Sequence, residues 1–427
     1  MNIQIRGVEI FDKDSLHNGI TTNIFIQDGL IKNISDERLD AEIIIESPGL
    51  LASPGWFDMR AHFADPGFES KEDLFSGSEA AAAGGFTEVA LLPNTSPVIQ
   101  TKNEISYIKS RNFHSLVQLY PMGAVTLQTK GEELTEMIDM YHAGAIAFSD
   151  GEKPLWHSDV LLKTLLYLQQ FDGLLINKAE DKFLNMFGNM HEGVNSTLLG
   201  LKGMPSLSEE LTMMRDLKIL EYTGGKIHFS NISSAGGVKL IKEAKSKGLS
   251  VTCDIAAHQL LFDDNVLQDF DTNYKVNPPF REQTDIEALI EGIIDDTIDV
   301  IVSAHTPQDA ESKNLEFDLA EFGIIALQTV FPILNQFQER IGLGKILEKI
   351  NYNPRKILKV SQPTIKEGSK ANITVFNSSQ EWSFNEQTNK SKSHNSPLFN
   401  QKLRGKVVAV FNNNQFKYDE NLASKHE

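Results

Sequence analysis

The stretch Pro54-Gly55-Trp56-Phe57-Asp58-Met59-Arg60-Ala61-His62-Phe63 decides the fold of this chain of 427 residues. It opens the long middle part of the chain, from about residue 55 to about residue 360, which alternates short apolar runs with longer segments of helical pattern. Repeated β–α units over roughly 300 residues predict either a (β/α)₈ barrel or a doubly wound sheet. Periodicity alone does not choose between them, because both folds repeat the same unit.

The predicted elements of this middle part fall into two classes. Apolar runs of the kind found in buried strands occupy residues 87–92, 145–148, 173–176, 226–229, 250–253 and 299–302. Segments of helical composition lie between them, at residues 102–111, 209–222 and 238–247.

Both ends of the chain are also rich in strand-like runs. Residues 3–5 and 23–27 near the start, and residues 371–376 and 406–411 near the end, run apolar or alternate. The segment 378–396 is polar and poor in large apolar residues, so we expect it to be a surface excursion. Two strand-rich ends around a long middle predict a small β domain built from both termini, with the parts 1–54 (β domain), 55–360 (barrel) and 361–427 (β domain).

Composition and charge exclude several classes of partner. Hydrophobic residues make up 41% and charged residues 23% of the chain, as in ordinary globular proteins. The net charge of −18 repels phosphate backbones, so we do not expect nucleic acid as a partner. The single cysteine, Cys253, forms no intramolecular disulfide framework and is expected in the core. Residues 1–6 lack the apolar core of a signal peptide and no run is long enough to span a bilayer, so a cytoplasmic protein without membrane association is expected.

The opening stretch closely resembles the Pro-Gly-x-x-Asp-x-His-x-His signature of the dihydroorotases, a family of the amidohydrolase superfamily, with Arg60 where the first histidine belongs. Further landmarks resemble the family in the same order, at residues 66–73, 76–77, 83–87, 93–97, 191–193, 199–201, 277–281 and 322–325. The resemblance runs from about residue 54 to about residue 376. It implies an α/β fold, a metallo-dependent hydrolase barrel of the (β/α)₈ TIM type with a small composite β domain. Trp56, at the end of the first strand, is expected to pack in the core.

Dihydroorotases open or close a cyclic amide with one or two zinc ions, which polarise the carbonyl group and generate hydroxide from a bound water. Zinc needs histidine nitrogens and carboxylate oxygens at about 2 Å. Of the ligand positions that the resemblance implies, His62 keeps its histidine. The other positions carry Arg60, Lys178, Asn231, Ala304 and, in an alignment without a gap, Gly151. A deletion of one residue would instead place Asp150 at that last position. Because most ligand positions carry other residue types, we expect no intact catalytic residue and no zinc or other cofactor.

Arg60 and Lys178 put cationic side chains where the metal ions of the family lie. They are either residues that have drifted in a relaxed pocket, or they form an anion pocket or a polar plug that satisfies itself. A third possibility makes Lys178 a nucleophile, which would require a lowered pKa.

Substrate-binding positions are mixed. The resemblance makes Asn94, Asn277 and His305 candidates for hydrogen bonds to a substrate. The arginine with which the family grips the substrate carboxylate is Ala64 here. Without that arginine, we favour a structural role for these three residues and for His62, as loop caps or as buried histidines bonded to the backbone.

The losses are selective. Scaffold motifs at residues 71–73, 84–85 and 277–279 persist, while ligands vanish at separate points along the chain. Resemblance to known inactive dihydroorotase-like subunits implies a structural or regulatory partner of aspartate carbamoyltransferase in pyrimidine biosynthesis, and the family implies a homodimer. Two alternatives remain open: an active dihydroorotase or cyclic amidohydrolase with a degenerate or metal-free site, and a small-molecule sensor that uses the cationic pocket.

Overall fold

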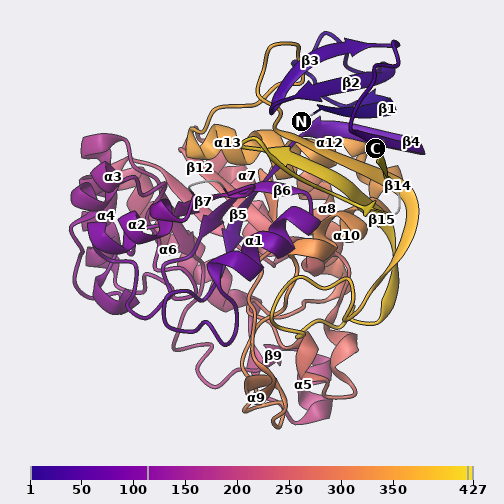
Figure 1. Ribbon diagram of the computed structural model, residues 1–427. Coiled ribbons are helices and arrows are strands. Elements are labelled where there is room, and N and C mark those ends of the chain that lie inside the picture. The colour runs from indigo at the N-terminus through magenta and orange to yellow at the C-terminus, as the bar shows by residue number, and fades with distance from the viewer. Residues whose placement is uncertain (1, 113–114, 421–422, 426–427) are drawn as a thin grey trace.

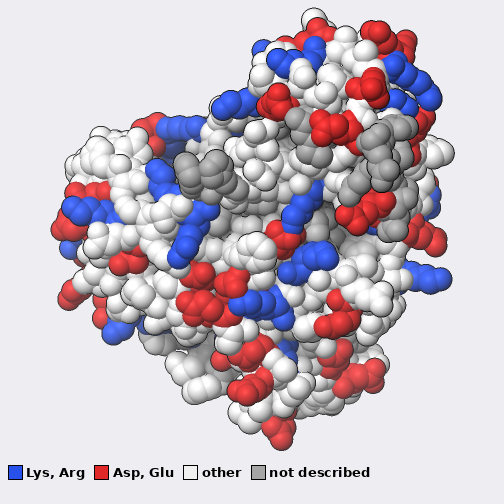
Figure 2. All heavy atoms as spheres, viewed as in Figure 1, with Lys and Arg blue, Asp and Glu red and all other residues white. Residues whose placement is uncertain are grey.

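A computed structural model describes residues 2–112, 115–420 and 423–425. A separate sheet domain lies on a larger body of mixed helices and strands (Figure 1). This confirms the expected α/β class with a separate sheet domain. On the face seen in Figure 2, acidic and basic side chains are mixed over both parts. Among the described residues, no helix is long and apolar enough to cross a membrane.

The sheet domain combines strands from both ends of the chain. Its order is β16-β15-β14-β4-β1-β2-β3, and β17 also pairs with β4. The antiparallel pair β4–β14 places Pro54 opposite Ile373, and branched side chains such as those of Ile5, Ile24 and Val375 fill the core. The bounds are β1 Asn2–Ile10, β2 Thr21–Gln27, β3 Leu30–Ser35, β4 Ile43–Pro54, β14 Ile373–Phe384, β15 Gln401–Asn412, β16 Gln415–Tyr418 and β17 Ala423–Lys425. The domain boundaries near residues 54 and 360 stay a prediction.

Parallel strands form two sheets in the body, β5-β6-β7 and β13-β12-β11-β8. Isolated parallel bridges link them, from Gly123 to Phe148, from Phe148 to Leu175, and from Ala61 to His305. The bounds are β5 Trp56–Ala61, β6 Phe86–Leu91, β7 Gln118–Pro121, β8 Leu175–Lys178, β11 Ile227–Ser230, β12 Val251–Ala256 and β13 Val300–Val302. The predicted strand at 145–148 is not a regular strand, but Phe148 forms parallel bridges to Gly123 and Leu175 and the N–H of Ile146 donates to the carbonyl oxygen of Pro121 at 3.0 Å.

Helices follow most of these strands, and α4, α6, α7 and α8 pack side by side. The predicted helices at 102–111, 209–222 and 238–247 correspond to α2, α6 and α7 with shifted ends. The bounds are α1 Leu74–Ala83, α2 Lys102–Ser110, α3 Met137–Ala143, α4 Ser158–Leu168, α5 Val194–Leu199, α6 Ser206–Thr223, α7 Ala235–Ser246, α8 Gln283–Ile294, α9 Ala310–Lys313, α10 Val330–Gln336, α11 Gln338–Ile341, α12 Leu343–Leu347 and α13 Asn353–Leu358. The short strands β9 (Met190–His191) and β10 (Gly203–Met204) pair with each other.

The packing roles expected of two single residues are confirmed. Trp56 is fully buried, and its ring meets those of Phe86 and Phe376 edge to face. Cys253 is fully buried in β12.

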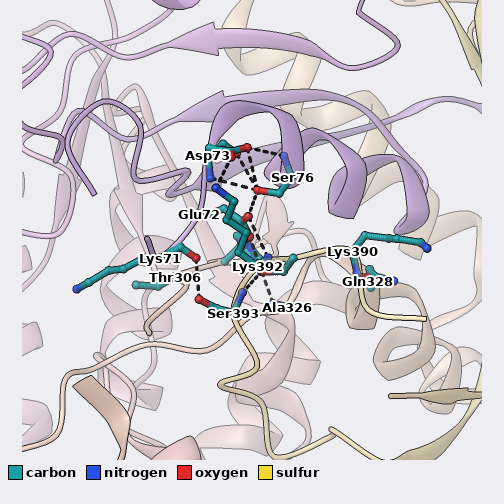
Figure 3. Close-up of polar contacts among 12 residues, drawn as sticks. Lys71, Glu72, Asp73, Ser76, Thr306, Ala326, Gln328, Lys390, Lys392 and Ser393 are labelled. Carbon is teal, nitrogen blue, oxygen red and sulfur yellow. Dashed lines mark hydrogen bonds and ion pairs between the residues drawn. The ribbon is translucent and has the colours of Figure 1, made fainter. Parts of the chain in front are cut away.

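The expected surface excursion at 378–396 is wrong for its last part. Four residues there are buried: Ser391, Ser393, Asn395 and Ser396. The β14–β15 hairpin carries this loop back onto the body, where Ser393 Oγ donates to the carbonyl oxygen of Lys71 at 2.7 Å (Figure 3). Asn395 Nδ2 donates to the carbonyl oxygen of Thr306 at 3.1 Å. Polar side chains can be buried when each finds a partner, so polar composition did not mean exposure here.

Candidate functional site

A cavity of about 550 Å³ lies where strands of both parallel sheets end. Arg60 is near the end of β5 and Lys178 ends β8. Asn231 follows β11 directly, and Ala304 lies two residues after β13. The carboxyl ends of parallel strands meet at one edge of the sheet, so these separated positions converge. Six of the residues singled out in the sequence line this cavity: Arg60, Asn94, Lys178, Asn231, Asn277 and Ala304.

His62, Asp150 and Gly151 lie beside the cavity. His62 Nε2 is 2.9 Å from the carbonyl oxygen of Asn94, and burial lowers the pKa of His62 against the opposing pull of Glu152. The carboxylate of Asp150 accepts hydrogen bonds from the backbone N–H and the hydroxyl group of Thr126. Burial raises the pKa of Asp150 to about 6. Asp150 is therefore engaged with Thr126 rather than turned towards Arg60.

Position 151 has no room for a side chain in this arrangement. Gly151 has a positive φ of 65°, and a Cβ built on it would overlap Oδ1 of Asn94. Asn94 itself is fixed, because its Nδ2 donates to the carbonyl oxygen of Asp150 at 3.0 Å and its Oδ1 accepts from the N–H of Glu152 at 3.0 Å. The Asn94 side chain thus braces the cavity wall.

Glu72 is the centre of a buried cluster of polar contacts (Figure 3), and His305 belongs to this cluster. Its Nδ1 accepts from the N–H of Ala326 at 3.1 Å, and its Nε2 is 3.4 Å from Oε2 of Glu72. Glu72 is fully buried and also accepts from the hydroxyl groups of Ser76 and Ser391. Burial acts to raise the pKa of Glu72, but His305 and the two serines outweigh it and hold that pKa below its usual value. Both ring nitrogens of His305 therefore have partners within the protein.

Lys178 is neutralised by a carboxylate that the sequence reasoning missed. Its Nζ lies 2.7 Å from Oε2 of Glu180 and donates to the carbonyl oxygen of Glu152 at 3.2 Å. Glu180 also accepts from Nδ2 of Asn277 at 3.1 Å. Burial acts to raise the pKa of Glu180, but the Lys178 ammonium group together with hydrogen bonds from Asn277 and Asn185 outweighs it, so that pKa is lowered. Glu180 lies two residues beyond the end of β8, where no strand alternation fixes its direction, so its nearness to Lys178 in the sequence was the signal for the pair.

The electrostatic environment of Arg60 differs from that of Lys178. Arg60 is 4% exposed, and among the described residues no carboxylate forms an ion pair with it and its Nη1 has no hydrogen-bond partner. In the amide orientation that satisfies both ends, Oδ1 of Asn231 accepts from Nε of Arg60 at 2.9 Å, and its Nδ2 lies 3.3 Å from Oδ1 of Asp254. The guanidinium group is thus anchored on one edge while its positive charge stays unneutralised.

His258 also lines the cavity and was not singled out in the sequence. It follows β12 and is 4% exposed, and its Nδ1 has no hydrogen-bond partner in the described part of the chain. Burial, with a contribution from the charge of Arg60, lowers the pKa of His258 to about 3. Its imidazole is therefore neutral at physiological pH. Its position shortly after a predicted strand was a signal, since the other converging residues also lie at or just beyond the ends of strands.

The polar donors in this cavity do not fit a zinc ion. An arginine side chain has no lone pair to give, alanine has no donor atom, and the lysine amine is held by Glu180. In the residues that the structure describes, no group of three or more His, Cys, Asp or Glu side chains could hold a metal ion.

A buried carboxyl group beneath the cavity makes stability depend on pH. Asp58 accepts from the N–H of Ser303 at 2.9 Å and from the hydroxyl group of that serine. Burial raises the pKa of Asp58 from 3.8 to about 7, against these hydrogen bonds. The folded state thus holds a proton that the unfolded state has lost between about pH 4 and 7, so this group's contribution to stability declines as the pH rises through that window.

We therefore expect Asp58→Asn, which imitates the protonated acid, to remove that decline. Urea titrations at pH 4 to 8 would give the free energy of unfolding of both proteins. The value for the variant minus that for the parent should rise with pH by up to about 1.4 kcal/mol per pH unit within the window. Asp150 titrates in both proteins and cancels in the difference. Parallel curves would show that Asp58 is already ionised when folded.

The family model and the curated relatives that match this chain agree on one family. A family model described as dihydro-orotase-like matches residues 49–236. The dihydroorotase of Caldanaerobacter subterraneus subsp. tengcongensis is 38% identical over 405 residues, covering 93% of this chain and 94% of the relative. The dihydroorotase of Acetivibrio thermocellus is 40% identical over 408 residues, covering 94% and 96%. The L-hydantoinase of Arthrobacter aurescens shares the fold with a TM-score of 0.82 at 20% identity, covering 96% of this chain and 94% of that one.

Proposed function

The chain belongs to the dihydroorotase family, and from this premise we propose that it is a dihydroorotase-like protein of pyrimidine biosynthesis that no longer hydrolyses cyclic amides. We further infer that its two parallel sheets, with the bridges at Phe148 and at Ala61, make up the (β/α)₈ barrel of the amidohydrolases. The L-hydantoinase likeness supports that inference.

One observation carries the proposal. Arg60, Lys178, Asn231 and Ala304, which stand at ligand positions by resemblance to the family, converge on a single cavity. None of them offers zinc a histidine nitrogen or a carboxylate oxygen. Without the metal, nothing in the cavity would lower the pKa of a water molecule or polarise a carbonyl group as the family's chemistry requires.

The backbone around the lost ligands supports a retained scaffold. Asn231 and Ala304 both have positive φ angles, of 55° and 50°, which cost an alanine roughly 1 kcal/mol. Gly84 lies so close to the carbonyl oxygen of Leu327 that a Cβ would overlap it. The chain keeps this demanding backbone conformation although the metal ligands are replaced. Such retention is expected of a protein that acts through its surface.

We propose that this surface serves aspartate carbamoyltransferase, as a structural or regulatory partner, and that the chain itself is a homodimer. Co-expression with the transferase of the same organism, followed by size exclusion with light scattering, tests both points. We expect one co-eluting species whose mass contains two copies or a multiple of two. Two independent monodisperse species on mixing would overturn the partnership.

Loss of catalysis is tested by activity and metal content together. The purified chain, expressed with added zinc and without a metal-binding tag, should hold less than about a tenth of an equivalent of zinc. It should hydrolyse dihydroorotate no faster than buffer does. The Acetivibrio thermocellus relative, prepared in parallel, is the positive control. Tightly bound zinc with turnover near that of the relative would make this chain an active dihydroorotase.

A further inference from the structure

We propose that the cavity binds a small organic carboxylate through Arg60, at the place where the family holds metal ions. This inference rests on the proposed function, because an anion can take this place only if zinc does not. The arginine that grips the substrate carboxylate in the family corresponds to Ala64 by resemblance, so Arg60 would create a different anion site.

The first argument is the unneutralised charge of Arg60. Burying a guanidinium group without a counter-charge carries a large desolvation cost, so such groups are normally paired. In the described part of the chain Arg60 has no ion pair, and of its N–H groups only that on Nε has a partner, Asn231. The remaining edge is the planar fork that fits a carboxylate with two parallel hydrogen bonds.

The second argument concerns the charge of the ligand. Lys178, the other buried cation of the cavity, already has Glu180 at 2.7 Å. Arg60 therefore supplies one uncompensated positive charge, which matches a singly charged carboxylate better than a doubly charged phosphate. Glu152 also lines the cavity and would repel additional negative charge.

The other residues that line the cavity indicate the size and polarity of the rest of the ligand. The neutral imidazole of His258 can donate or accept one hydrogen bond near Arg60. Among the mostly polar residues of the rest of the lining are the apolar side chains of Val98, Val276, Phe322 and Ile324. The cavity volume of about 550 Å³ is in the range of small-molecule sites. These walls fit a carboxylate at one end of a compact, partly apolar body.

Calorimetric titration with propionate and benzoate tests the proposal, with the uncharged propionamide and benzamide as matched probes and inorganic phosphate as a third arm. We expect the carboxylates to bind and the amides not to bind. Arg60→Gln should weaken carboxylate binding at least about tenfold. Lys153→Gln, which removes one exposed positive charge from the cavity rim, should change it less than about twofold.

If Arg60→Gln does not fold, Arg60→Lys keeps the charge without the fork and should still weaken binding measurably. Binding of phosphate but not of carboxylates would overturn the proposal, as would no binding of either. Carboxylate binding as tight in Arg60→Gln and Arg60→Lys as in the parent would also overturn it. This outcome is separate from the proposed function. Hydrolysis of dihydroorotate with bound zinc would refute the function, whereas absent hydrolysis without carboxylate binding would refute only this inference.

Discussion

Glu72→Ala is expected to lower the free energy of unfolding by about 3–5 kcal/mol. The carboxylate is fully buried, and its removal leaves His305 Nε2, the hydroxyl group of Ser391 and the N–H of Lys392 without this acceptor, while Ser76 keeps Asp73. Unsatisfied buried donors lose the full cost of their desolvation. Urea unfolding followed by circular dichroism would measure the change.

The matched control for this variant is Glu69→Ala, which removes an exposed carboxylate three residues earlier in the same loop. We expect that control to stay within about 0.5 kcal/mol of the parent. Because Ser391 belongs to the loop that covers this part of the body, limited proteolysis of the Glu72 variant should cut near it sooner than in the parent. A variant as stable as its control would mean that the loop is held by its other contacts.

Rebuilding the ligand set should produce the second large effect. A chain with Arg60→His, Lys178→His, Asn231→His and Ala304→Asp, with His62 unchanged, should bind about one zinc per chain, compared with under a tenth for the parent. The four positions line one cavity, so the new donors would face one another. Elemental analysis after dialysis would give the stoichiometry.

The single variant Arg60→His serves as the control and should remain essentially free of zinc, because two histidines are too few ligands. Zinc should also raise the unfolding temperature of the fourfold variant but not that of the control. A folded fourfold variant without zinc would show that the ligand positions inferred from the family are misplaced.

The convergence of the cavity residues could be predicted from the sequence, but their electrostatic state could not. Landmark motifs place Arg60, Lys178 and Asn231 at strand ends, and parallel strands bring such ends together. Whether each cation is paired depends on side-chain directions, which motifs do not encode. Lys178 forms an ion pair with Glu180, two residues away, whereas Arg60 forms a hydrogen bond only with the side-chain amide of Asn231.

The loop that ends at Ser396 shows a second limit. Its composition is polar, yet Ser391 is buried because its hydroxyl group donates to Glu72. This partner lies 319 residues away in the sequence, so local composition did not reveal it. Local composition indicates exposure only when no distant partner is available.

The composite sheet cannot be completed until the C-terminal strands have been synthesised. Near its end, β4 pairs with β14, and Asn377 Nδ2 donates to the carbonyl oxygen of Pro48, 329 residues earlier. At about 5–20 residues per second, the ribosome needs on the order of tens of seconds to deliver that partner. During this time β4 presents an unpaired strand edge, which is a template for pairing with other chains. The rest of the chain must therefore fold beside a half-finished sheet, and we expect misassembly to be favoured where several nascent chains lie close together on one messenger RNA.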